Sequence, residues 1–241
     1  MKEKLFLNPR CKGDLWLYNQ ERFLDHSYQS FLHRHDELEL NLVLRGRGVY
    51  LLNNRKVEMA PNAMLWLFPE QEHLLLEKSL DFEMWILVVK PEYLREICTN
   101  EESQVLLQGD PGSSFCRSLA SLSVQKLSGL CKETLGARND LALFNISVGY
   151  ILLSAWAAYQ TASAGGSEKR IHPAIEKAAR RIMEGQGRDE LGLLAQDAGL
   201  SPSSLSRQFK RILSPPIGRP RPRSQYSVCP CSYSYNPRQL W

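Results

Sequence analysis

The hydrophobic pattern of the chain changes near residue 90. Before this point, short apolar or alternating runs are separated by glycine, asparagine and proline, which is typical of strands joined by tight turns. The runs predict strands at residues 15–18, 38–44, 49–52, 64–68, 73–76 and 82–89, with hairpin turns at 44–48 and 52–55. Spacing of this kind favours an antiparallel barrel or sandwich.

After residue 90 the apolar positions recur at helical spacing. Helices are predicted at residues 92–98, 114–131, 141–160 and 172–185, and the stretch 161–167, TASAGGS, has the composition of a flexible linker. The expected fold is mixed α+β. An antiparallel β-barrel followed by helices occupies residues 1–160, a linker 161–170, a small all-α domain 171–213, and a disordered Pro/Arg-rich tail 214–241.

The small all-α domain has the spacing of a helix-turn-helix. Ala195 lets two helices approach, Gly199 takes the left-handed turn between them, and Leu205 closes their core. Ser201 suits the N-cap of the second helix, and Pro202 suits its first position. The polar outer face of that helix fits a major groove. We expect base contacts from Ser203, Ser204, Arg207, Gln208 and Arg211, and phosphate contacts from Arg180, Arg181 and Lys210.

Charge separates the two ends of the chain. Residues 161–241 hold 13 Lys and Arg against 6 Asp and Glu, whereas the preceding residues have a net charge of −3. This asymmetry indicates that only the back half meets a polyanion such as DNA. The six cysteines form no CxxC pair and the first residues have no apolar run, so we expect reduced thiols in a cytoplasmic protein. Residues 141–160 carry no charge, but their polar residues favour a core or dimer helix over a membrane span.

In the strand-rich half, several polar residues are spaced so that their side chains fall on the same face of an extended segment. His33 and His35 lie on the same side of an extended segment, and Glu39, four residues further on, keeps that parity. His73 supplies a fourth group from a later strand. Two or three histidines and a carboxylate suit Zn, Fe, Mn or Ni. The same groups also suit a metal-free role, in which they line the barrel and bind an organic effector.

The order HxHxxxE, six residues, G and a distant H resembles the cupin barrel motif. That resemblance maps the metal ligands of cupins onto His33, His35, Glu39 and His73. The glycine that usually precedes the first histidine is absent, and 28–29 (Tyr-Gln) stand in that region.

A cupin-like barrel, helices, a linker and a basic helix-turn-helix together resemble the AraC/XylS-type bacterial transcription regulators, over about residues 10–213. The segments 33–39 and 45–48 carry the resemblance in the barrel. It implies a front domain that dimerises and senses a small-molecule effector, a back domain that binds DNA, no catalysis, and no cofactor or metal. The effector is then expected near His33, His35, Glu39, Trp66 and His73.

The chain departs from that family after residue 213. Family members carry two helix-turn-helix units, and the signature of the second, an aromatic-Arg-Phe-Lys run ending in Thr-Pro, is absent. Our hypothesis is that the last 28 residues result from a frameshift or truncation that impairs DNA binding, which reading the other two frames beyond codon 213 tests. The alternative function is a metal-dependent cupin enzyme of the dioxygenase or isomerase type.

Overall fold

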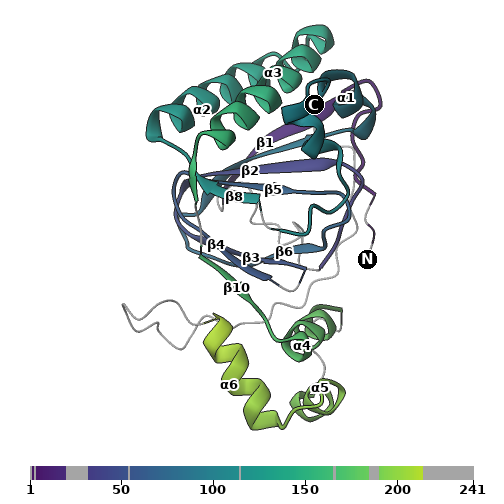
Figure 1. Ribbon diagram of the computed structural model, residues 1–241, viewed down its shortest axis with the longest axis vertical. Helices are drawn as coiled ribbons and strands as arrows, with labels where there is room; N and C mark the ends of the chain where they lie inside the picture. The colour runs from purple at the N-terminus through teal and green to yellow at the C-terminus, as the bar shows by residue number, and fades with distance from the viewer. Residues whose placement is uncertain are drawn as a thin grey trace.

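A computed structural model describes residues 2, 4–19, 32–53, 55–113, 115–164, 167–184 and 190–213, with the backbone alone at 164, 167–170, 180, 182–184 and 210–213. The strands are β1 (Gly13–Asn19), β2 (Leu38–Arg45), β3 (Gly48–Leu52), β4 (Arg55–Met59), β5 (Ala63–Leu67), β6 (His73–Lys78), β7 (Glu83–Val89), β8 (Phe115–Ser118), β9 (Ser163–Ala164) and β10 (Ser167–Arg170). They form two antiparallel sheets, in the orders β1-β7-β2-β5-β8-β9 and β10-β4-β3-β6, which face each other as a barrel (Figure 1).

A layer of helices covers the outer face of the larger sheet (Figure 1). The helices are α1 (Pro91–Ile97), the 3-10 helix η1 (Glu101–Leu107), α2 (Ser121–Gly136) and α3 (Leu141–Gln160). The start of α3 is capped by Asp140, whose carboxylate accepts hydrogen bonds from the backbone N–H groups of Ala142 at 3.1 Å and Leu143 at 3.0 Å. Apolar residues of the helices and of the outer sheet face form the largest hydrophobic cluster.

Among the described helices, α3 alone has the length and composition that a membrane span requires. One face of α3, which includes Phe144, Val148 and Ile151, is buried in the cluster between the helices and the sheet. The helix is therefore part of the barrel's core on that side.

The fold class is confirmed, and the differences from the sequence prediction are local. Periodicity does not predict β4, β8 or η1. A helix is predicted from residue 114, yet β8 lies there and α2 begins only at Ser121. The backbone of β8 pairs with β5, with Leu65 opposite Cys116. Tertiary pairing of this kind overrides a local helical pattern in a four-residue segment.

The expected flexible linker contains two of the short strands. β9 pairs with β8, and β10 pairs with β4, so each extends one edge of a sheet. Pairing at a sheet edge uses backbone N–H and C=O groups. The small residues of this stretch leave those groups accessible. The residues of β9 and β10 are therefore paired within the sheets. The composition of the stretch instead predicts an unpaired linker.

A helical unit, residues 171–213, contains α4 (Pro173–Glu184), α5 (Leu191–Asp197) and α6 (Pro202–Leu213) and lies at the lower end of Figure 1. The turn between α5 and α6 has Gly199 at φ +66°, as predicted. The predicted cap is also present, because the Ser201 hydroxyl accepts a hydrogen bond from the backbone N–H of Ser204 at 3.2 Å. Leu205 is fully buried.

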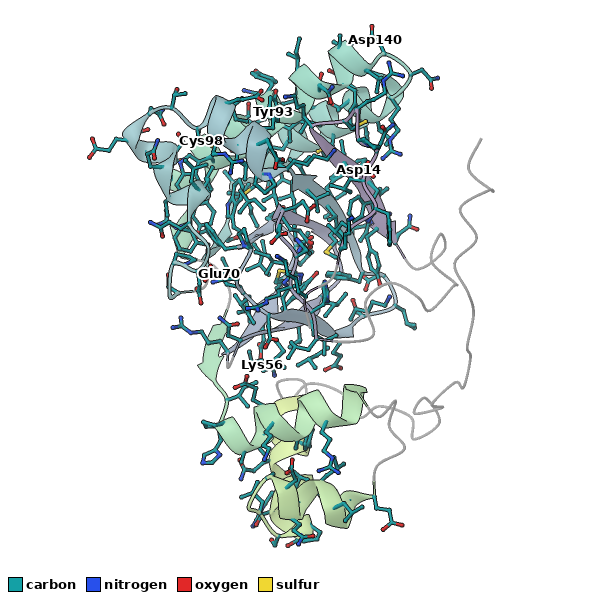
Figure 2. The ribbon with its side chains drawn as sticks, turned by 90° about the vertical axis from the view of Figure 1, so that its right-hand side faces the viewer. Asp14, Lys56, Glu70, Tyr93, Cys98 and Asp140 are labelled. Carbon is teal, nitrogen blue, oxygen red and sulfur yellow. The ribbon has the colours of Figure 1, made fainter. Side chains whose placement is uncertain are left out.

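The helical unit packs against the smaller sheet through a shared hydrophobic cluster. The barrel contributes Leu32, Leu51 and Leu74, and the helical unit contributes Ile171, Ile175, Ala178, Leu194, Ala195 and Leu205. Figure 2 shows Lys56 of β4 on this side of the barrel, where its ammonium group lies 3.0 Å from the Glu58 carboxylate. The predicted tail, residues 214–241, and residues 28–29 lie outside the described residues.

Candidate functional site

Three buried histidines and one glutamate meet inside the barrel. His33 and His35 point inward on either side of the exposed Arg34, and each is at most 1% exposed. His73 begins β6, and its backbone pairs with that of His33 through N···O distances of 2.8 and 3.2 Å. Glu39 reaches the same place from β2. The structure therefore brings together His33, His35 and Glu39, which share one parity, and His73, the fourth group expected from a later strand.

Glu39 lies at the centre of this cluster. Its Oε2 atom is 3.1 Å from His35 Nε2 and 4.0 Å from His73 Nε2. Its Oε1 atom accepts a hydrogen bond from Asn41 Nδ2 at 2.8 Å, and the same amide lies 3.3 Å from the Tyr50 hydroxyl. One carboxylate oxygen is thus held in place while the other faces the histidines.

Backbone carbonyls orient two of the histidine rings. His35 Nδ1 lies 3.0 Å from the carbonyl oxygen of Glu37, and His73 Nδ1 lies 3.0 Å from that of Gln71. Because a carbonyl oxygen can only accept, each Nδ1 carries a proton and donates it. The Nε2 atoms of both rings are left facing Glu39.

Burial and pairing shift the pKa values of the cluster in different directions. Burial lowers the pKa of His35, but the hydrogen bond and charge of Glu39 outweigh this and raise it overall. Burial opposes the ionisation of Glu39, yet His35 and His73 hold the pKa of its carboxyl at about 2. Burial lowers the pKa of His73 to about 3, against a weaker opposing effect of Glu39. At neutral pH the cluster thus combines a carboxylate with a neutral His73.

Trp66 does not join the cluster, contrary to the prediction. Trp66 pairs with Leu40 in the β2–β5 register, and both lie in the hydrophobic cluster between the sheet and the helices. Its ring packs edge-on against Trp156, with centroids 5.6 Å apart. Glu39 pairs with Leu67, which belongs to the cluster inside the barrel. Trp66 therefore points to the opposite face of the sheet from the histidines.

Asn41 was not expected at the site, although its position carries a signal. It follows Glu39 by two residues on the same strand, so it shares the inward parity of the carboxylate. It is fully buried, and it holds Glu39 Oε1. A second polar residue at an inward position, two residues after Glu39, is the feature that would have identified it.

The candidate DNA-binding residues lie on α6 and α4, and the structure describes some of them. Ser203 and Arg207 are exposed on α6, whereas Gln208 is half-buried. The Ser204 hydroxyl lies 2.9 Å from that of Ser201 and 3.4 Å from an Arg207 nitrogen, within the helix cap. Arg181 lies 3.5 Å from the Asp197 carboxylate. The side chains of Arg180, Lys210 and Arg211 lie outside the described part.

Comparison with known proteins gives a family match for the barrel and its first helices. The profile described as AraC-like ligand binding domain matches residues 18–145. No curated protein matches the sequence.

Several solved structures are similar to the chain at low identity. The AraC-like transcriptional activator CuxR is 15% identical, with a TM-score of 0.38, and the match covers 82% of this chain and 67% of CuxR. ToxT from Vibrio cholerae O395 is 9% identical, with a TM-score of 0.34, and the match covers 83% of this chain and 70% of ToxT. ToxT of Vibrio cholerae strain SCE256 with a bound unsaturated fatty acid is 12% identical, with a TM-score of 0.34 and the same coverage.

Proposed function

Because the chain belongs to the family with an AraC-like ligand-binding domain, we propose that it is a ligand-responsive, DNA-binding transcription regulator. The observation that carries the proposal is that this sensor barrel and a basic helical unit occur in one chain and share a hydrophobic cluster. Such packing lets a change in the barrel reach the helical unit. The family match favours a regulator over the metal-dependent enzyme that the cupin-like motif also allows.

The helical unit supplies the proposed DNA contacts. The positive φ of Gly199 and the Ser201 cap set α6 at an angle to α5, with Ser203 and Arg207 on its exposed side. We expect Ser203, Ser204, Arg207, Gln208 and Arg211 to read bases and Arg180, Lys210 and Arg181 to contact phosphates. Arg181 would have to leave Asp197 in order to do so. A single unit with few phosphate contacts binds weakly, with a log-log salt slope of roughly −3 to −5.

The barrel supplies the proposed ligand site, formed by His33, His35, Glu39 and His73. These residues are at most 1% exposed, and they lie beside the hydrophobic cluster that fills the barrel between its two sheets. A buried polar cluster stabilises a barrel less than an apolar core of the same volume does. The presence of the polar cluster inside the barrel is explained if the cluster binds the effector.

The outward face of α3 supports the expected homodimer. Leu143, Ile146, Tyr150 and Leu153 are exposed at spacings of three, four and three residues, which forms one apolar stripe along the helix. A continuous stripe of this kind is typical of a helix that packs against a second copy. We place the regulator in the cytoplasm, where DNA is accessible to it.

Substitution of Arg207 tests the proposed DNA binding. Binding sites are first selected from a random DNA library with the wild-type protein, and affinity is then measured by fluorescence anisotropy at one salt concentration. Arg207→Ala is expected to weaken binding to a selected site by about 1–3 kcal/mol, roughly 5- to 150-fold, and to affect scrambled DNA much less.

The matched control is Arg95→Ala, which removes an exposed arginine from α1 on the barrel, where its only described ion pair is a 3.9 Å contact with Glu92. It should leave DNA binding unchanged. Equal losses for the two variants, or no enrichment of any sequence by the wild-type protein, would contradict the assignment of α6 as a DNA-reading helix.

A further inference from the structure

The geometry inside the barrel points to the chemical class of the effector, an inference that rests on the proposed regulatory function. We propose that the barrel senses a divalent first-row transition-metal ion, bound by the imidazoles of His33, His35 and His73 and the carboxylate of Glu39. The ligand atoms of the three histidines lie within 4.8 Å of one another, and Glu39 Oε2 lies beside two of them.

The orientation of the rings matches that of metal ligands. Metal-binding histidines almost always donate their second ring N–H to a carbonyl or carboxylate, which directs the free nitrogen at the ion. His35 and His73 both do this, through Nδ1 contacts of 3.0 Å with the carbonyls of Glu37 and Gln71. Asn41 fixes the remaining oxygen of Glu39 in the same way. The supporting contacts of a metal site are therefore already formed.

A positive charge between His73 Nε2 and Glu39 Oε2 would stabilise this pair of facing acceptors. His73 Nε2 has no hydrogen-bond partner among the described residues, and it faces Glu39 Oε2 at 4.0 Å. That separation is too long for an N–H group on Nε2 to donate to the carboxylate. With the proton on Nδ1, a lone pair faces a carboxylate oxygen. A shared cation turns this repulsive arrangement into two bonds.

The dimensions of the cluster suit an ion better than an organic molecule. Zn–N and Zn–O bonds of about 2.0–2.2 Å place two ligands on one ion roughly 3–3.5 Å apart. The separation of 3.1 Å between His35 Nε2 and Glu39 Oε2 already fits this range, and the ligand atoms of the three histidines lie within 4.8 Å of one another. All four side chains are at most 1% exposed. Imidazole nitrogens select Zn, Ni, Co, Fe or Cu over Mg and Ca.

Residues next to two of the metal-binding histidines pack against the helical unit. Leu32 precedes His33, and Leu74 follows His73, so each leucine points away from the histidine beside it. Both leucines lie in the hydrophobic cluster shared with the helical unit, which also contains Ile171. Drawing the two paired histidines toward an ion therefore moves the surface on which the helical unit packs.

Metal binding by the full chain tests the proposal. Protein purified without a His-tag and stripped with a chelator is titrated with Zn²⁺ and Co²⁺ by calorimetry and absorption spectroscopy, with Mg²⁺ as the comparison. We expect one Zn²⁺ or Co²⁺ per chain, a visible Co²⁺ band, and no response to Mg²⁺. His73→Gln and Glu39→Gln should each weaken binding by roughly 100-fold or more, the upper end of what loss of a supporting residue costs.

The matched control is His172→Gln, because His172 is an exposed histidine outside the cluster. Wild-type protein that fails to bind Zn²⁺ or Co²⁺ stoichiometrically overturns the proposal without reference to any variant. Binding that is lost equally in His172→Gln and His73→Gln also overturns it, since it would then be surface binding. Circular dichroism establishes that each variant is folded before its affinity is compared.

Hydrogen exchange separates this inference from the proposed function. Zn²⁺ should change the exchange of backbone amides in residues 190–213 of the wild-type chain and leave them unchanged in His73→Gln. If metal binds without this change, the coupling is wrong. If the wild-type protein selects DNA sites but binds no metal, the regulator stands and the metal effector is wrong. If it binds metal but selects no DNA, the proposed function fails instead.

Discussion

The barrel and the helical unit differ in how much hydrophobic core each has to itself. The barrel contains one cluster between its larger sheet and the helices, centred on residues such as Trp66, and a second between its two sheets, which includes Leu65. Among the described residues of the helical unit, the buried apolar side chains belong to one small cluster, and Leu32, Leu51 and Leu74 of the barrel are part of it. We therefore expect the barrel to fold on its own core and the order of the helical unit to depend on the surface beneath it.

Polar groups show the same contrast. The barrel encloses Glu39 and its histidine partners, so each of these groups acts at low dielectric. In the helical unit, Asp197 pairs with Lys177 at 3.0 Å and with Arg181 at 3.5 Å, on the surface. Ion pairs exposed to water contribute little to stability. Because the helical unit has only a small core, we expect a small change at the buried site to have a large effect on it.

The largest effect is expected from a cavity in the barrel. Trp66 is fully buried and packs against Trp156 and Tyr159, with centroids 5.6 and 6.2 Å apart. Trp66→Ala should lower the free energy of unfolding by about 3–5 kcal/mol, because the surrounding side chains fill the space only partly. Chemical denaturation followed by circular dichroism measures the loss. Since the barrel supports the helical unit, both should unfold in one transition at lower denaturant.

Leu80→Ala is the control, because Leu80 is 72% exposed. It should change the free energy of unfolding by less than about 0.5 kcal/mol. If Trp66→Ala unfolded the barrel and left the helical unit intact, the helical unit would not depend on the barrel, and the comparison between the two would be wrong.

A second prediction tests the dependence from the opposite side. Leu205 on α6 is fully buried in the shared cluster, and Leu205→Ala should cost about 2–5 kcal/mol in the helical unit. We expect faster hydrogen exchange in α5 and α6 with unchanged exchange in the barrel strands. Leu191→Ala, at an exposed position of α5, is the control. Equal loss of protection in β2 and β7 would mean that the two parts fold as one unit.

The sequence predicts the polar site well because alternation in a strand is a strong constraint. His33, His35 and Glu39 are recognisable as one set from parity alone, and they do meet. Trp66 was assigned wrongly because every residue of β5, from Ala63 to Leu67, is buried. A strand covered on both faces has no polar alternation, so its sequence does not reveal which side lies inside the barrel.

Other elements escaped prediction because their partners are distant in sequence. β8 is four residues long and exists through its pairing with β5, some fifty residues earlier. β10 pairs with β4 at the edge of the smaller sheet, although it lies within the expected linker. By contrast, the bounds of α3 follow from the uncharged stretch that Asp140 caps. Sequence patterns predict an element when its own residues stabilise it. They fail when pairing with a distant segment stabilises it instead.

The smallest effect is expected at the cap of α6. The Ser201 hydroxyl accepts a hydrogen bond from the Ser204 N–H at 3.2 Å, which satisfies one of the free donors at the start of the helix. Ser201→Ala should destabilise the helical unit by about 0.5–2 kcal/mol, and Ser201→Asp should restore most of that loss because aspartate also caps. Native-state hydrogen exchange of the α6 amides measures this, and Gln196→Ala at an exposed position of α5 is the control. In a domain with a large core of its own, so small a loss of stability would leave the helix protected from exchange. Here it should weaken α6 selectively, and an equal effect in the barrel would remove the distinction between the two parts.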